Sequence, residues 1–505
     1  MLVQSTCHSA SDDPPSGCPL DVLPSPSIMS SSTADTSSSP RGAAPTWVCL
    51  LLCVLAFVDA FDSQILPAAP AQFQYFIQTS TNTTNNEGMY FGVLSSAFIT
   101  SFSIGILAFG YVSMSMRPFR VISIGVAVLV VAVFLSAISK RANSFELLLV
   151  GRVLSGAGEA AFQCVAPAFF TTHASPNAET LWLGVYSVST TLGAVVGGIT
   201  SAVAASTIGW DALFALEGLV LMPLLGVCLG GIPRSIDTLD DLTAEAPPCL
   251  PHETHHLLDN TTTQTTAPSF VRELVAVCHN TVFVWLCLGS AALAFASSCA
   301  SSFLTLLLLG LNVFRDETDA NVTQGAIGMV TSIGGTLLGS LLLDWTCRGA
   351  PQHRRSYFAL RQLVVLMPLV VVNMVAGLAG LPNRQWYLVT AAIDGLLTAS
   401  LPTILMTALL HAVDPSRRAL TMGIYTLVVH VLGDVPSPVL MGAIKDAWAP
   451  ACNSILVDGL VKLNPQCVQD KAGLMQAMLF PVAWDLWAVV CFGVALVVMR
   501  RAKQV

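Results

Sequence analysis

Arg152 and Glu159 are ionisable residues inside the otherwise apolar stretch Gly151–Phe170, which reads GRVLSGAGEAAFQCVAPAFF. Their separation of seven residues is about two helical turns, so both side chains lie on one helix face. If the stretch spans a bilayer, each charge costs roughly 2.5 to 3.5 kcal/mol, and such residues usually serve a function. The small residues Gly156 and Gly158 let a neighbouring helix approach closely. We therefore expect a tightly packed helix with an ionisable stripe.

Two acidic residues, Asp59 and Asp62, lie three residues apart in the apolar segment 47–67, so they share one face of a helix. A carboxyl group in a low-dielectric site can hold a proton. Asp59 and Glu159 are therefore candidates for proton coupling, and Asp62 and Arg152 are candidates for the wall of a substrate cavity.

A third group of polar residues lies near the C-terminus. His430 and Asp434 have the i, i+4 spacing of one helix face, and Pro436 and Pro438 follow them. Both prolines lack a backbone donor, so we expect the helix to break or kink just past Asp434. A broken helix beside ionisable groups is typical of a substrate or ion site.

Some of these residues also allow a purely structural interpretation. Arg152 could pair with backbone carbonyls or a carboxylate at a helix interface, and His430 could be an interhelical hydrogen-bond donor rather than a proton carrier. Asp485 could be a satisfied helix contact instead of a cavity residue. Glu217 and Asp394 lie nearer the ends of their apolar segments, where we expect water to hold them.

The composition places the chain in a membrane. Hydrophobic residues make up 54%, charged residues 10%, and the mean hydropathy is +0.70, which excludes a soluble globular protein. The net charge of −8 is thinly spread, so nucleic acid is not an expected partner. Most of the cysteines lie in apolar segments, which argues against a metal cluster. No phosphate loop, metal-ligand spacing or catalytic triad is present, so we expect neither an enzyme nor a cofactor.

Segments of about 20 apolar residues are long enough to cross a bilayer, and the chain contains twelve of them in two sets of six. We expect spans at 47–67, 89–113, 119–139, 144–172, 181–204, 211–232, 279–311, 325–345, 359–380, 385–411, 418–447 and 475–499. The sequence thus predicts an all-α membrane protein with five regions: a disordered cytoplasmic tail (1–45), an N-terminal six-helix bundle (46–232), a cytoplasmic linker (233–277), a C-terminal six-helix bundle (278–500) and a short tail (501–505).

Lys and Arg in the short loops set the orientation, because cytoplasmic loops carry an excess of both. Their distribution predicts that both termini are cytoplasmic. Sequons at Asn82 and Asn321 then lie on the outer side, where glycosylation occurs. Cys452 and Cys467 share the oxidising loop before the last span, where either a disulfide or two free thiols fit.

Three stretches resemble a known family, the third of them in part. Residues 417–446 contain His430, Leu432, Gly433, Asp434, Ser437 and Pro438 in the pattern H-x-L-G-D-x-x-S-P. This pattern is similar to the spinster-type branch of the major facilitator superfamily. The stretch from Arg152 to Pro167 resembles the fourth helix of that family, and Phe57–Phe61 partly resembles its first-span signature.

The resemblance implies a major facilitator fold, in which two pseudo-symmetric six-helix bundles rock around a central cavity. It implies export of lysophospholipids or sphingoid lipids, linked to protons, with Asp59 and Glu159 as the protonation switch. Arg152 would hold Glu159 or a headgroup phosphate, and His430, Asp434 and Ser437 would line the C-terminal wall.

The sequence departs from the family at two places. Ala60 stands where the family has an Arg, and the loop after the second span has Met114 and Ser115 in place of the usual Asp and Arg. The first loss leaves an acid-rich cavity, which favours a zwitterionic or cationic headgroup over sphingosine phosphate. The second puts the cytoplasmic gate in question.

We therefore expect a monomeric, proton-coupled lipid transporter. An acidic-dileucine spacing at Glu253, Leu257 and Leu258 suggests endolysosomal sorting, with the plasma membrane as the alternative location. Two other functions stay open: a major facilitator transporter of a small polar solute or organic cation, and a membrane sensor or scaffold that no longer transports.

Overall fold

A computed structural model describes ten stretches of the chain: 45–83, 86–113, 115–173, 179–233, 236–237, 275, 277–348, 354–413, 418–457 and 460–502. Residues 1–44 of the predicted tail, most of the predicted linker, the dileucine motif and Met114 lie outside these stretches.

Within these ranges, twelve helical segments are long and apolar enough to cross a membrane. They are α1 (Thr46–Ala68), α3 (Glu87–Ser113), α4 (Pro118–Ala142), α5 (Phe145–His173), α6 (Glu179–Thr207), α7 (Trp210–Gly230), α10 (Thr281–Gly310), α11 (Glu317–Thr346), α12 (Arg355–Ala379), α13 (Arg384–Leu410), the interrupted span α14–α15 and α16 (Lys471–Ala502). Each coincides with one predicted span, so the twelve-span prediction is confirmed. The largest difference is at α11, which begins before residue 325 because the Asp316 side chain caps it at the Asp319 amide.

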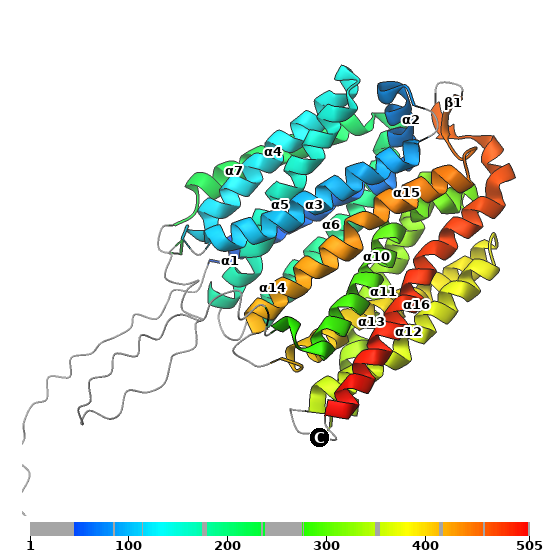
Figure 1. The fold of residues 1–505 in the computed structure, drawn as a ribbon. Coiled ribbons are helices and arrows are strands. Elements are labelled where there is room, and N and C mark those ends of the chain that lie inside the picture. The colour runs from blue at the N-terminus through cyan, green and yellow to red at the C-terminus, as the bar shows by residue number, and fades with distance from the viewer. Residues whose placement is uncertain are drawn as a thin grey trace, which may run out of the picture. The chain divides into compact units, whose positions relative to one another are not determined.

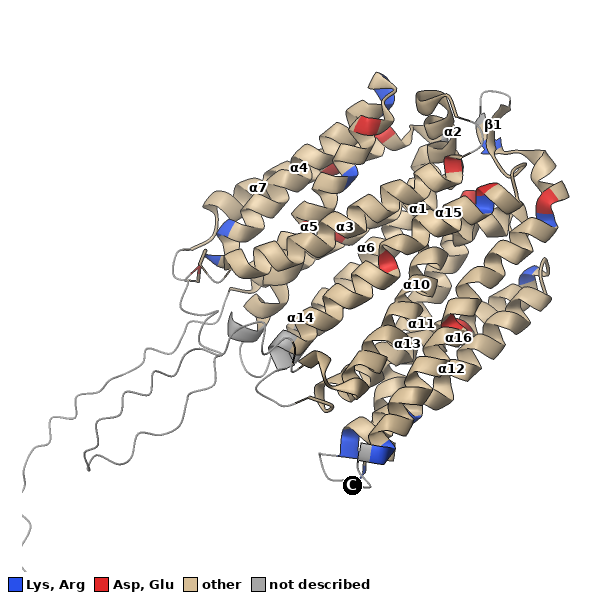
Figure 2. Ribbon diagram, viewed as in Figure 1, with Lys and Arg blue, Asp and Glu red and all other residues tan. Residues whose placement is uncertain are grey.

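The outward helix faces are apolar, as a lipid environment requires. Leu216 and Leu229 on α7 and Leu341 on α11 are more than half exposed, although they are large aliphatic side chains. Figure 2 shows Lys and Arg mainly at the ends of the helices, with few charged residues along their middles. The chain is therefore a multi-pass membrane protein.

The eleventh span is interrupted where the two prolines predicted it. Helix α14 (Arg418–Val429) passes into a π-helical turn (His430–Asp434), and α15 (Pro436–Trp448) follows. Pro438 supplies no amide hydrogen, so the carbonyl oxygen of Asp434 is open to other donors, and Ser437 Oγ donates to it over 3.1 Å. A second side chain binds the turn from the first half. Ser96 Oγ of α3 donates to Val435 O over 2.6 Å.

Several short elements lie at one end of the helices, and the hydropathy pattern did not predict them. They are α2 (Pro70–Thr81), a two-stranded antiparallel hairpin of β1 (Ser454–Val457) and β2 (Leu460–Leu463), and the 3₁₀-helix η4 (Pro465–Asp470). We call this end the hairpin end, and the end where α1 begins and α16 finishes the terminal end (Figure 1).

Helices of each half of the chain pack mainly on one another. In the first half α1 packs on α6, and α5 on α3 and α4; in the second, α10 packs on α16, and α13 on α11 and α12. The halves meet where α3 packs on α15 and α6 on α11. Glycine permits the closest approaches: a Cβ at Gly193 of α6 would clash with the carbonyl oxygen of Phe57 on α1.

We predict that Gly193→Val lowers the thermal stability of the purified protein by an amount typical of overpacking, about 1–3 kcal/mol, because the added side chain must push α6 from the α1 backbone. Gly184→Val is the matched control, since the same helix has open space around Gly184. Melting temperatures in detergent measure both. Equal melting temperatures for the two variants would contradict the close α1–α6 contact.

Candidate functional site

A buried ion pair joins α5 to α1 near the middle of the first half. Arg152 Nη1 lies 3.0 Å from Asp62 Oδ2, and the two side chains are 2% and 0% exposed. Ser155 Oγ donates to the same oxygen over 2.8 Å, and the guanidinium of Arg152 lies 4.5 Å from the ring centroid of Phe98 on α3. The sequence left three partners open for Arg152: Glu159, a headgroup phosphate, or a carboxylate at a helix interface. The structure gives the third, because α1 and α5 present Asp62 and Arg152 to each other.

Asp59 lies one helical turn before Asp62 and takes part in a different network. Its Oδ2 accepts a hydrogen bond from Gln163 Nε2 over 2.6 Å, and Tyr186 OH on α6 donates to Gln163 Oε1 over 3.2 Å. The carboxyl group of Glu159 lies against those of Asp59 and Asp62. Gln163, which we did not single out from the sequence, therefore connects the carboxyl group of Asp59 to the half-buried Tyr186.

Glu217 of α7 completes the cluster. We expected it at the membrane interface, and this expectation is wrong: the residue is 4% exposed, and both carboxylate oxygens are buried without a hydrogen-bond partner among the described residues. Its neighbours are Asp62, Arg152 and Asp59. The error came from counting distance along the segment, which does not show that α7 packs on α1 and α4 and covers this side chain.

The charges of the cluster do not balance. Four carboxyl groups from α1, α5 and α7 surround Arg152, which is the one cation against them in the described part of the chain. Asp62 is the ion-pair partner of that cation. Ionising the other three would bury unpaired charge, at a penalty of several kcal/mol each. The cluster can therefore bind protons inside the membrane.

In the second half, the π-helical turn brings His430 and Asp434 together. His430 Nδ1 lies 2.7 Å from Asp434 Oδ2, and the side chains are 23% and 20% exposed. The imidazole makes an edge-on contact with Phe102 of α3, with ring centroids 6.2 Å apart. Ser437 is fully buried, and its hydroxyl donates to Asp434 O over 3.1 Å. His430 and Asp434 thus face the first half, whereas Ser437 supports the turn.

Asp485 of α16 is buried, and its Oδ1 has no hydrogen-bond partner among the described residues. Nearby, a mainly apolar cavity of about 280 Å³ lies inside the second half, and Asp394 of α13 lines it. Asp394 is half-buried with its Oδ1 covered, and the expectation that water holds it stays a prediction.

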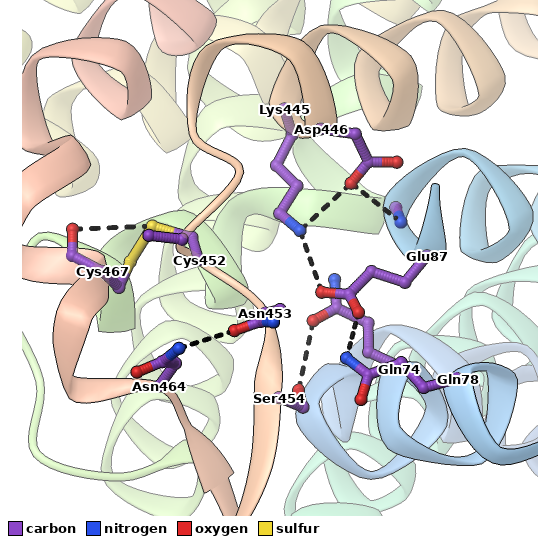
Figure 3. A network of polar contacts seen from close by, with 12 residues as sticks. Gln74, Gln78, Glu87, Lys445, Asp446, Cys452, Asn453, Ser454, Asn464 and Cys467 are labelled. Atoms are coloured by element: carbon purple, nitrogen blue, oxygen red, sulfur yellow. Dashed lines mark hydrogen bonds and ion pairs between the residues drawn. A yellow bond between two sulfur atoms is a disulfide. The ribbon is translucent and has the colours of Figure 1, made fainter. Parts of the chain in front are cut away.

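A polar network closes the hairpin end between the halves, and Figure 3 shows its members. Lys445 of α15 is 1% exposed; its Nζ lies 3.2 Å from Glu87 Oε1 and 3.1 Å from Asp446 Oδ1. Asp446 accepts hydrogen bonds from the Gly88 and Met89 amides in the first turn of α3. Lys445 was not among the candidate residues from the sequence, and this network was not predicted.

The remaining predicted residues lie close to the hairpin end. Cys452 and Cys467 form a disulfide. Asn82 follows the last residue of α2, and Asn321 Nδ2 donates to Ala68 O over 2.9 Å. Glycosylation of both residues stays a prediction. In the described ranges no group of three or more His, Cys, Asp or Glu could hold a metal ion.

The model of the Major Facilitator Superfamily matches residues 52–438. Together with the twelve spans and the membrane-embedded charge cluster, this match shows that the chain belongs to that superfamily of membrane transporters.

The similar proteins place it in the spinster-type branch. A probable sphingolipid transporter, spinster homologue 2 of Arabidopsis thaliana, is 25% identical over 83% of this chain and 86% of its own length. A sphingosine-1-phosphate transporter of Xenopus tropicalis is 25% identical over 70% of this chain and 66% of its own. The fold is that of a bacterial homologue of the human lysosomal transporter spinster, solved in an inward-facing, unoccupied conformation: the TM-score is 0.67, the identity 17%, and the match covers 90% of this chain and 98% of that one.

We predict that Arg152→Gln destabilises the protein by about 3–5 kcal/mol, because it leaves Asp62 buried without its cation. Adding Asp62→Asn should recover most of that loss. Asp319→Asn, which removes the partner of the exposed Arg384, should cost at most about 1 kcal/mol. Melting temperatures of the wild type and the three variants provide the test, and equal melting temperatures for the single and double variants at the buried pair would contradict the coupling.

Proposed function

We propose that this spinster-type transporter is a proton-coupled secondary transporter of lysophospholipids or sphingoid lipids. The observation that supports the proposal best is the excess of carboxyl groups over cations in the buried cluster of Asp59, Asp62, Glu159, Glu217 and Arg152. A transmembrane proton gradient can drive a transporter that binds and releases protons at such a site.

Asp59 and Glu159 are the proposed coupling pair. Their carboxyl groups are adjacent, so they repel each other when both are ionised and share a hydrogen bond when one holds a proton. Ala60 supplies no charge beside Asp59, and the hydrogen-bond donor on Asp59 is the neutral Gln163. Without a fixed cation, a proton is the remaining source of neutralising charge, so the departure at Ala60 is compatible with coupling.

The proposed transport cycle alternates between closure of the two ends. Hydrogen bonds between the halves, within the described ranges, all lie toward the hairpin end: Ala71 to Glu317, Asn321 to Ala68, Gly88 and Met89 to Asp446, Lys445 to Glu87, Ser454 to Gln74, and Ser96 to Val435. If the termini are cytoplasmic, as the distribution of Lys and Arg suggests, this conformation is closed to the outside. Proton exchange with the outside would then require opening of the hairpin end.

The charge of the site bears on the headgroup. Arg152 is paired with Asp62 and almost fully buried, so it is not free to bind a phosphate. His430 and Asp434, which are more exposed, form a mixed-charge pair when the imidazole is protonated. A zwitterionic headgroup matches such a pair better than a doubly anionic one.

We infer a monomeric transporter in an endolysosomal or plasma membrane.

We predict that an imposed proton gradient drives uptake of labelled lysophosphatidylcholine into proteoliposomes, and that Glu159→Gln reduces the driven flux at least tenfold, because a permanently neutral side chain cannot release a proton. Glu146→Gln, an exposed acid on the same helix, should keep the wild-type flux. Gradient-independent flux in the wild type would remove the proton from the proposal. Absence of lipid flux from folded protein would favour the polar-solute or the sensor function, which a wider substrate panel and a binding assay separate.

We further predict that lysophosphatidylcholine competes more strongly than sphingosine 1-phosphate for uptake. The reason is that Arg152, the buried cation of the cluster, already has a carboxylate partner. Competition curves at equal free lipid concentration measure the preference. Stronger competition by sphingosine 1-phosphate would contradict the headgroup inference and would agree with the name of the Xenopus relative.

A further inference from the structure

We propose that Glu217 of α7 is a second proton-binding site, in which its neutral carboxyl group donates a hydrogen bond to the free oxygen of Asp62. The inference deepens the proposed function and, for its role in transport, rests on it. The proton site itself depends only on the geometry of α1, α5 and α7.

Four buried carboxyl oxygens of the cluster have no hydrogen-bond donor among the described residues: Glu159 Oε1 and three on Asp62 and Glu217. Arg152 Nε is a buried donor that likewise has no partner there. Asp62 Oδ2 accepts from Arg152 Nη1 and Ser155 Oγ, but Asp62 Oδ1 has no partner among the described residues. Glu217 Oε1 and Oε2 have none either. Helix α7 packs on α1, and Asp62 is a neighbour of the Glu217 carboxyl group across this contact. One proton on Glu217 gives Asp62 Oδ1 a donor and removes the charge of Glu217.

The surroundings of Glu217 oppose its ionisation. Helix α7 packs on α4, α1 and α6. Asp59 and Asp62 face it from α1, and Arg152 and Glu159 lie behind them on α5. On the other two neighbours, Lys140 at the end of α4 pairs with Asp211, and the neutral Tyr186 of α6 donates to Gln163.

A bound metal cation is the alternative source of positive charge. A hard cation such as Ca²⁺ takes six or more oxygen ligands, and Mg²⁺ takes six in a regular arrangement. In the described part of the chain no cluster of acidic, His or Cys side chains meets the geometry of a metal site. A proton needs only one donor–acceptor contact, which Glu217 and Asp62 provide.

The cluster would then contain two proton sites with different roles. The Glu217 proton would hold Asp62 in its pair with Arg152, and the Asp59–Glu159 pair would exchange a proton during transport. Loss of the Glu217 proton would place a second anion beside Asp62 and weaken the contact between α1 and α5. The inference therefore predicts that Glu217 stabilises the arrangement in which the coupling pair works.

The test is the pH dependence of thermal stability in detergent, which does not require transport. Glu217 keeps its proton in the folded protein and releases it at neutral pH on unfolding, so it should make the wild type less stable as the pH rises from about 6 to about 8. Glu217→Gln and Glu217→Met, both neutral, should flatten this decline. The Gln variant should melt at a higher temperature than the Met variant throughout, because its amide can still donate to Asp62 Oδ1. Glu146→Gln is the control and should keep the wild-type decline.

A decline in either Glu217 variant as steep as in the wild type would overturn the inference. Failure of both neutral variants to fold would also overturn it, because a site for a neutral carboxyl group should accept the near-isosteric Gln. Replacing sodium with choline in the buffer tests for a cation, and a loss of wild-type stability there would assign the site to a metal ion. Flux assays separate the two proposals: a flattened decline without gradient-driven lipid uptake in the wild type supports the Glu217 site and contradicts the proposed function.

Discussion

The ion pair between Arg152 and Asp62 is the interaction on which the rest of the first half depends. A buried charge is tolerated in a membrane helix when a partner of opposite charge compensates it. Arg152 compensates one carboxylate, so every further carboxyl group in the same interior needs another source of neutrality. This single constraint connects the packing of α1 against α5 with the capacity of the protein to bind protons.

At the hairpin end, carboxylates also compensate a buried cation, here across the boundary between the halves. Lys445 is as deeply buried as Arg152, but its carboxylate partners come from both halves: Glu87 from α3 and Asp446 from α15. The amides of Gly88 and Met89 also bind Asp446, so the first turn of α3 is held by the end of α15. Opening this end must expose or re-pair these charges. The network thus closes the hairpin end through ion pairs and hydrogen bonds, for which water can compete. Water cannot compete in this way for the apolar contacts between the helices.

Hydropathy was sufficient to predict the spans. Only a helix forms all of its backbone hydrogen bonds within one segment, and a helix that crosses the bilayer needs about 20 apolar residues. The interruption near Asp434 was also predictable, since Pro436 and Pro438 cannot donate. The short helix α2 and the hairpin could not be predicted, because they lie outside the apolar spans and their sequences have no strong hydrophobic periodicity.

The pairing of the charges could not be predicted for a different reason. The sequence places Arg152, Glu159 and Asp62 on helix faces, but which of them meet depends on the rotation of α1 against α5. The burial of Glu217 and Lys445 likewise depends on neighbouring helices that are distant in the sequence. Ionisable residues were thus correctly selected as candidates, whereas their partners required the three-dimensional structure.

Infrared spectroscopy of the purified protein tests the central claim most directly, because the carbonyl stretch of a neutral carboxylic acid is separate from the bands of a carboxylate. The account predicts a neutral-acid band at neutral pH that shifts in heavy water, weakens as the pH is raised and loses intensity in Glu159→Gln. A wild-type spectrum without a neutral-acid band at neutral pH would show that the buried carboxyl groups are all ionised and would contradict the account.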